Sequence, residues 1–239
     1  MGLRLIMRKL RKQQLVLSDY FTVVAILCLV ARSVFAIVVG LWGNNNNMKP
    51  GHPFTTTEIY QRVVGSKLTL ADRMVYNTYL WIQKSIVLLL YNQIFSCLPF
   101  AALVIKTYWV TLLATYLTVQ GASFVDCRPI RLYWQVVPDP GHCTSATIQL
   151  STFVALNMAT DLMLLIFPMP AIFSLKTYSL RRRLQLFALF SLGILLLVVA
   201  ILRLPVYSNG TSQVRRYTWG SVEQFGAALS LTAHDVAAT

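Results

Sequence analysis

Apolar residues in this chain gather into long blocks that are separated by short polar stretches. Each strong block holds about twenty residues, the length that a helix needs to cross a hydrocarbon core roughly 30 Å thick. A last, weaker block carries His234 and Asp235 in its second half, where a lipid-facing helix stays apolar. The pattern predicts an all-α fold, a polytopic transmembrane helix bundle at 19–239 that follows a basic segment at 1–18. The strong spans are predicted at 19–43, 76–98, 101–125, 148–172 and 185–207, and the weak span at 218–239.

The composition agrees with a membrane protein. Of the 239 residues, 56% are hydrophobic and 12% are charged, whereas roughly 25% of the residues in soluble domains are charged. A formal net charge of +13 indicates a nucleic-acid partner when a chain is soluble. Here the basic residues lie beside apolar spans, so they indicate membrane topology and we expect no nucleic-acid partner.

Two basic clusters predict the orientation. The first lies in residues 1–14, ahead of the first span, and the second lies between the fourth and fifth spans. The second cluster comprises Lys176, Arg181, Arg182 and Arg183. The positive-inside rule places both clusters and the N-terminus in the cytoplasm, so the loop 126–143 and the glycosylation sequon at Asn209 lie outside. We expect a multi-pass protein of the plasma membrane or another secretory-pathway membrane, whose basic loop contacts anionic lipid or a cytosolic signalling partner.

The predicted outer loop 126–143 has the most individual polar sequence in the chain. Cys127 and Cys143 lie in an oxidising compartment under this topology, and a disulfide between them would stabilise the fold by roughly 3 kcal/mol. Tyr133 and Trp134 suit the membrane interface, and several prolines stiffen the backbone. The loop is therefore either a structural cap or a lid over a ligand site.

Charged residues within the apolar spans are candidates for a polar site. Asp161 lies near the centre of the fourth span, and Arg32 and Lys84 lie at similar depth in the first two. Either base would offset the desolvation of the acid, and Asn157 lies one helical turn before Asp161. The group is either a structural ion pair or a site for a ligand or a proton.

Motifs of soluble metal and nucleotide enzymes are missing from the sequence. It contains no HExxH, no C-x-x-C pair and no phosphate-binding glycine loop, and its three histidines are far apart. We therefore expect no metal site and no catalytic cluster of the soluble type.

Four stretches, in this order, resemble one known family: IQKSIVLLLYNQIF, DCRPIRLYW with GHC, NMATDLMLLIFPMPAIFSL and RRRLQLFALFSLGILLLVVAILRL. They resemble the fungal rhodopsin-domain integral membrane proteins, which are similar to a membrane protein of the satratoxin biosynthesis cluster and to GPCR-like fungal sensors. The resemblance implies seven helices with a disulfide-bearing outer loop between the fourth and fifth. The five strong spans then correspond to helices two to six, Glu223 lies at the start of helix seven, and helix one is missing. The matching positions are Lys84, Cys127, Trp134, Cys143, Asp161, Pro168, Pro170 and Arg203.

The resemblance leaves three functions open. The first is receptor-like sensing of an extracellular small molecule or surface cue. The second is a membrane-bound enzyme or accessory protein of secondary metabolism that uses Asp161 or Glu223 as an acid, and the third is a transporter. A retinal pigment is not expected, because it requires a lysine in the last helix and residues 218–239 contain none.

Overall fold

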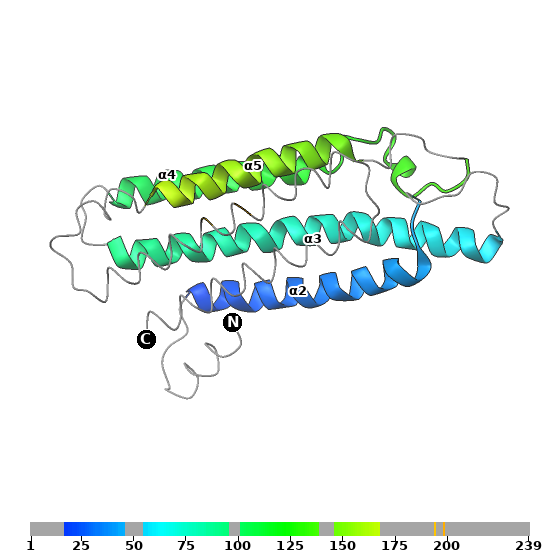
Figure 1. The fold of residues 1–239 in the computed structure, drawn as a ribbon, viewed down its shortest axis with the longest axis horizontal. Helices are drawn as coiled ribbons and strands as arrows, with labels where there is room; N and C mark the ends of the chain where they lie inside the picture. The colour runs from blue at the N-terminus through cyan, green and yellow to red at the C-terminus, as the bar shows by residue number, and fades with distance from the viewer. Residues whose placement is uncertain are drawn as a thin grey trace, which may run out of the picture. The chain divides into compact units, whose positions relative to one another are not determined.

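The computed structural model describes residues 17–45, 55–95, 101–138 and 146–167, together with the single helical positions Ile194 and Val198. Four long α-helices make up most of the described part of the chain, in which no strand occurs (Figure 1). The helices are α2 (Leu17–Trp42), α3 (Thr56–Phe95), α4 (Ala101–Ala122) and α5 (Thr147–Ile166), with a short 3₁₀-helix, η1, at Ile130–Tyr133. The all-α prediction agrees with these elements.

Helix α2 is apolar on the surface that the fold leaves uncovered. Leu27, Ile37 and Leu41 are each more than 60% exposed, which is the arrangement expected of side chains that face lipid. The helix ends where Gly43 adopts a positive φ of 73° and donates its backbone N–H to the Val39 carbonyl at 2.9 Å. A glycine in this conformation is the usual stop signal after a last helical turn.

Helix α3 corrects the predicted start of the second span, which was placed at residue 76. The helix instead begins at Thr56 and continues for 40 residues. A reciprocal cap starts it: the Thr55 N–H donates to Glu58 Oε2 at 2.9 Å, and the Glu58 N–H donates to Thr55 Oγ1 at 3.4 Å. This capping box satisfies backbone donors that a helix start otherwise leaves unbonded.

Helix α5 is capped from a distance. Asp126, in the loop that follows α4, accepts the backbone N–H groups of Ile148 at 2.9 Å and of Gln149 at 3.0 Å. The carboxylate thereby satisfies two free donors and lies at the positive end of the helix dipole. One residue of the outer loop therefore fixes where the next helix begins.

Three described helices are long and apolar enough to cross a membrane: Leu17–Trp42, Ala102–Ala122 and Thr147–Ile166. They correspond to the predicted spans at 19–43, 101–125 and 148–172. Residues 76–95 of the predicted span at 76–98 form the second half of α3, which is long enough but is not among the helices apolar enough to cross a membrane. The predicted spans at 185–207 and 218–239 lie outside the described residues, apart from Ile194 and Val198.

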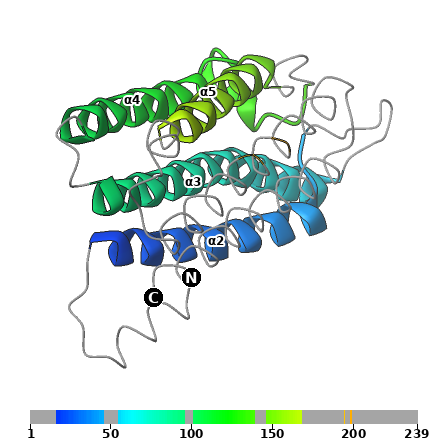
Figure 2. The same ribbon diagram turned by 60° about the vertical axis from the view of Figure 1, so that its left-hand side comes forward.

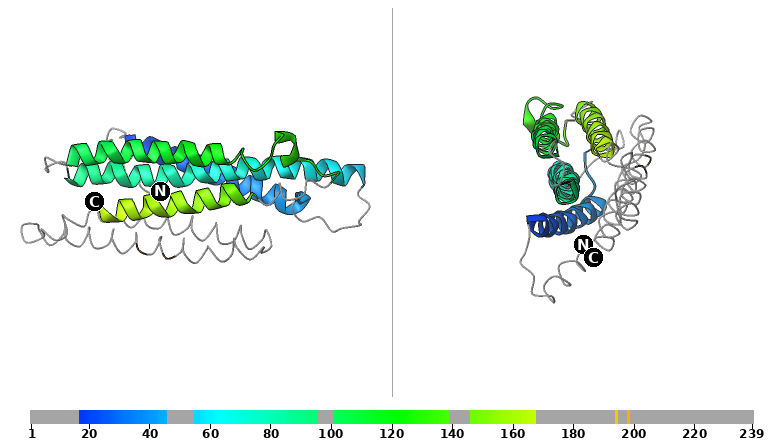
Figure 3. Two further views of the ribbon diagram at one scale, coloured as in Figure 1. Left: turned by 90° about the horizontal axis from the view of Figure 1, so that it is seen from above. Right: turned by 90° about the vertical axis from the view of Figure 1, so that its left-hand side faces the viewer.

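The chain divides into two compact units, and each long helix contributes to both. The first unit includes Ile82–Leu113 and the segments up to Val24 and from Val154, and the second comprises Ala25–Trp81 and Ala114–Phe153. In the first unit, Tyr108 Oη donates to the Met163 carbonyl at 3.0 Å, which joins α4 to α5. Figure 3 shows these two helices side by side.

In the second unit α2 packs against α3 in the antiparallel direction (Figure 2). Gly65 makes the closest approach: a Cβ at this position would lie only 2.0 Å from the Gly43 carbonyl oxygen. Because no side chain fits there, glycine is required for the two backbones to meet at this point. Ser66 Oγ then accepts the Asn45 N–H at 3.0 Å, and Arg62 donates to the Asn44 carbonyl at 3.0 Å.

Candidate functional site

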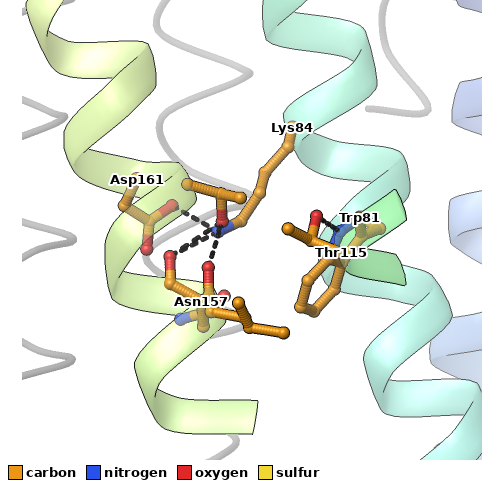
Figure 4. A network of polar contacts seen from close by, with 7 residues as sticks. Trp81, Lys84, Thr115, Asn157 and Asp161 are labelled. Atoms are coloured by element: carbon orange, nitrogen blue, oxygen red, sulfur yellow. Dashed lines mark hydrogen bonds and ion pairs between the residues drawn. The ribbon is translucent and has the colours of Figure 1, made fainter. Parts of the chain in front are cut away.

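The candidate site of the first unit is centred on the Lys84 ammonium. Lys84 extends from α3 toward α5, where its Nζ lies 2.8 Å from Asp161 Oδ1 (Figure 4). Nζ also donates to the Asn157 carbonyl at 2.8 Å and to Thr160 Oγ1 at 2.6 Å. A carboxylate, a carbonyl and a hydroxyl from one face of α5 therefore surround the ammonium.

This arrangement explains how a lysine remains in the core of an apolar bundle. An ammonium removed from water is strongly destabilising unless a counter-charge and hydrogen bonds replace its hydration. Among the described residues, Lys84 has one counter-charge and two further acceptors, enough for its three donor hydrogens. Thr160 itself donates to the Leu156 carbonyl at 2.7 Å, so its oxygen lone pairs remain directed at the ammonium.

The two charged partners differ in accessibility. The Lys84 side chain is 7% exposed, whereas the Asp161 side chain is 20% exposed. The ammonium is thus enclosed, while part of the Asp161 side chain is exposed.

Sequence reasoning left open whether Lys84 or Arg32 is the counter-charge of Asp161, and the structure brings Lys84 to it. Arg32 belongs to the second unit and pairs with Asp72 instead, with 3.6 Å between Arg32 Nε and Asp72 Oδ1. The guanidinium also stacks over Tyr76, with its Cζ 4.2 Å from the ring centroid. Arg32 and Asp72 therefore form a second buried pair that the sequence did not reveal.

Polar side chains also join α3 to α4 in the second unit. The Trp81 indole N–H donates to Thr115 Oγ1 at 3.1 Å (Figure 4). The Gln120 amide donates to Thr78 Oγ1 and to Tyr116 Oη, each at 3.1 Å. These bonds satisfy uncharged polar groups and bring no charge into the core.

The outer loop packs on the corner between α2 and α3 within the second unit. Asn45 Nδ2 donates to the backbone carbonyls of Tyr133 at 2.9 Å and Gln135 at 3.1 Å. Lys67 Nζ lies 5.4 Å from the centroid of the Trp134 ring. Burial raises the pKa of the Tyr133 phenol, and the Asp126 carboxylate raises it further. The loop is therefore held in place by the helix ends beneath it, as a structural cap requires.

The remaining predicted residues divide into two groups. Asn157 is buried and contributes its backbone carbonyl, and Cys127 is also buried. Because Cys143 lies outside the described residues, the Cys127–Cys143 disulfide stays a prediction. Glu223, Lys176, Arg181, Arg182, Arg183 and Asn209 likewise lie outside the described residues. Within the described ranges, no group of three or more His, Cys, Asp or Glu side chains that could hold a metal ion is assembled.

Sequence reasoning missed Asp72, Thr160, Asn45 and Asp126. Asp72 was not predicted because it lies before the predicted span at 76–98, in a polar segment that was not expected to be helical. The T-x-x-E capping box at Thr55–Glu58 is nevertheless a recognisable helix start. Thr160 and Asn45 carry no comparable signal, since their roles depend on which side chains the fold brings beside them.

The fold and its buried polar groups define a helical integral membrane protein. A profile of the fungal rhodopsin domain matches residues 3–231, and the chain therefore belongs to this family. A SAT4 family membrane protein of Emericella nidulans is 28% identical over 144 residues. That match covers 59% of this chain and 37% of the relative, so it spans little more than a third of the relative's length. No solved structure matches the chain.

Proposed function

We propose that the protein is a receptor-like membrane protein that binds a small extracellular molecule at the Lys84–Asp161 pair. The observation that carries the proposal is the unequal exposure of the pair: Asp161 is 20% exposed and Lys84 is 7% exposed. A ligand with a cationic or hydrogen-bond-donating group can therefore bind the carboxylate from its exposed side. The seven-helix frame of the family is part of this proposal.

Exchange of partners at this site links binding to a change in structure. A donor on the ligand competes with Lys84 for Asp161, while Lys84 retains the Asn157 carbonyl and the Thr160 hydroxyl. The ammonium thus keeps two of its three partners when the ion pair loosens, which lowers the desolvation penalty of separation. A ligand that prefers the loosened pair shifts the population toward an altered α3–α5 contact.

The alternating helix directions support the proposed topology. In the second unit α2 is antiparallel to α3, and α3 is antiparallel to α4, so the outer loop after α4 and the α2–α3 corner lie at the same end. The hydrogen bonds of Asn45 join these two connections. With a cytoplasmic N-terminus, both connections face the outside and the basic loop with Arg181 faces the cytosol.

A cue-response assay tests the proposal. A deletion strain is complemented with wild type or Asp161→Asn at matched surface levels and exposed to a panel of primary amines, alcohols and apolar surfaces. We expect Asp161→Asn to lose the response that wild type restores. Glu58→Gln, the same change of carboxylate to amide at the capping box of α3, should respond as wild type does.

A second variant separates folding from recognition. Lys84→Met with Asp161→Leu removes both charges and leaves neither one buried alone, so the helix bundle should still form. Normal surface expression of this double variant with no response supports the binding role. Wild-type responses from both Asp161→Asn and the double variant would refute it. Altered metabolite profiles with unchanged cue responses would instead favour the pathway enzyme.

A further inference from the structure

A second group of buried polar atoms lies around Arg32 in the second unit. Arg32 is 6% exposed, and its Nη1 has no hydrogen-bond partner among the described residues. Its Nε lies 3.6 Å from Asp72 Oδ1, which is too long for a hydrogen bond. Asp72 Oδ1 likewise accepts no hydrogen bond within the described ranges. The charges are close, yet a donor and an acceptor in this pair remain unfilled.

Gln149 on α5 carries a third buried polar atom of the second unit that has no hydrogen-bond partner among the described residues. Gln149 is 3% exposed, and its Oε1 has no partner in the described part of the chain. Phe153 packs on Tyr76 with 5.6 Å between ring centroids. Because α3 and α5 run parallel, one turn back from this contact places Gln149 level with Asp72. Tyr76 is also the ring over which the Arg32 guanidinium stacks.

These three atoms define the chemistry of a group that would satisfy them. Buried polar atoms are nearly always hydrogen-bonded, since an unpaired one is destabilising by about 1–3 kcal/mol. Arg32 and Asp72 are a buried pair of opposite charges, and the charge of Arg73 also acts on Asp72. A neutral occupant adds no further charge that would have to be desolvated. A hydroxyl group accepts from Arg32 Nη1 and donates to Asp72 Oδ1 or Gln149 Oε1, and it brings no net charge.

The geometry points to a binding site for one hydroxyl group, formed by Arg32, Asp72 and Gln149. The hydroxyl belongs either to an ordered water or to an apolar molecule that carries an alcohol, since both present the same donor and acceptor. A water with two to four polar partners is typical of a buried site of this kind. The site is separate in composition from the Lys84–Asp161 pair, whose ammonium already has three partners.

Radiolytic footprinting of the full chain in lipid nanodiscs tests the site, because radicals formed from a bound water label the nearest reactive side chain. Tyr76 reports on the site, and Tyr79, a fully buried tyrosine of the same helix, is the internal reference. We expect Tyr76 to be labelled well above Tyr79. Gln149→Leu should lower the ratio, whereas Gln135→Leu, the same change in the outer loop, should leave it unchanged.

Two probes distinguish the sources of the hydroxyl. If geraniol lowers the labelling of Tyr76 and geranyl methyl ether does not, the site binds an alcohol-bearing molecule. Tyr76 labelling that exceeds that of Tyr79, falls in Gln149→Leu and is changed by neither probe assigns the site to an ordered water. Both outcomes support the site, and the first requires no variant to fold. Tyr76 labelled no more than Tyr79, with no effect of geraniol on the labelling, overturns it.

Discussion

Asn45 and Tyr133, 88 residues apart in the chain, are joined by a hydrogen bond of 2.9 Å from Asn45 Nδ2 to the Tyr133 carbonyl oxygen. The same amide reaches the Gln135 carbonyl at 3.1 Å, and Asn45 is 8% exposed. One buried side chain thus satisfies two backbone carbonyls of the outer loop and attaches it to the end of α2. The loop depends on this contact for its position.

Replacing Asn45 with Ala should therefore lower the free energy of unfolding by about 1–3 kcal/mol, because one buried and one partly buried acceptor lose their donor. The measurement is chemical denaturation in detergent micelles, together with the rate of protease cleavage within 126–138, which should rise. Asn92→Ala, at an exposed position of α3, should stay within about 0.5 kcal/mol of wild type. Equal effects of the two substitutions would argue against the anchoring role.

Gly65→Ala should destabilise the contact between α2 and α3. The added Cβ would lie 2.0 Å from the Gly43 carbonyl oxygen, so the backbones must separate, and overpacking of this kind costs about 1–3 kcal/mol or more. Gly121→Ala is the matched control, since no atom lies within 4 Å of its added Cβ. There the alanine should be neutral or should stabilise α4 by about 0.5–1 kcal/mol. Thermal midpoints of both variants check the prediction, which fails if Gly65→Ala melts as Gly121→Ala does.

Asp161→Leu should destabilise the protein by about 3–5 kcal/mol, because it leaves the Lys84 ammonium buried without a counter-charge. Adding Lys84→Met should recover most of this loss, since replacing both members of a buried pair by apolar residues is often neutral or stabilising. A double-mutant cycle of unfolding free energies measures the coupling. Lys106→Met, on the exposed surface of α4, serves as the control for the lysine change. Additive effects of the two substitutions would show that the pair is not coupled.

Asp126→Ala should destabilise the start of α5 by about 0.5–2 kcal/mol, because two backbone donors lose their acceptor. Hydrogen exchange gives a local measurement: the amides of Ile148 and Gln149 should exchange faster, while that of Leu164 changes little. Asp126→Asn retains one side-chain oxygen and should have a smaller effect. Unchanged exchange at Ile148 in Asp126→Ala would contradict the capping role.

Hydrophobicity allowed most of the long helices to be predicted from the sequence. A helix of about twenty apolar residues crosses a bilayer whichever helices surround it, so α2, α4 and α5 could be predicted from their own residues. The expectation that Lys84 and Arg32 need counter-charges rests on the same kind of argument, because desolvation of a charge is a property of that side chain. The start of α3 was predictable too, from the capping box at Thr55 and Glu58, but the polar first half of this helix was not expected to be helical.

The sequence by itself thus determined the helical membrane class and the family. Only the tertiary structure decided that Lys84 pairs with Asp161 and Arg32 with Asp72, because the choice depends on helix rotation and register. Arg32 and Lys84 would each meet the electrostatic requirement of Asp161, but Arg32 pairs with Asp72, twelve residues before Lys84 on α3. Sequence spacing within one helix contains no information about the face that another helix presents. The role of Asn45 could not be predicted for the same reason, since its partners are backbone carbonyls that any sequence supplies.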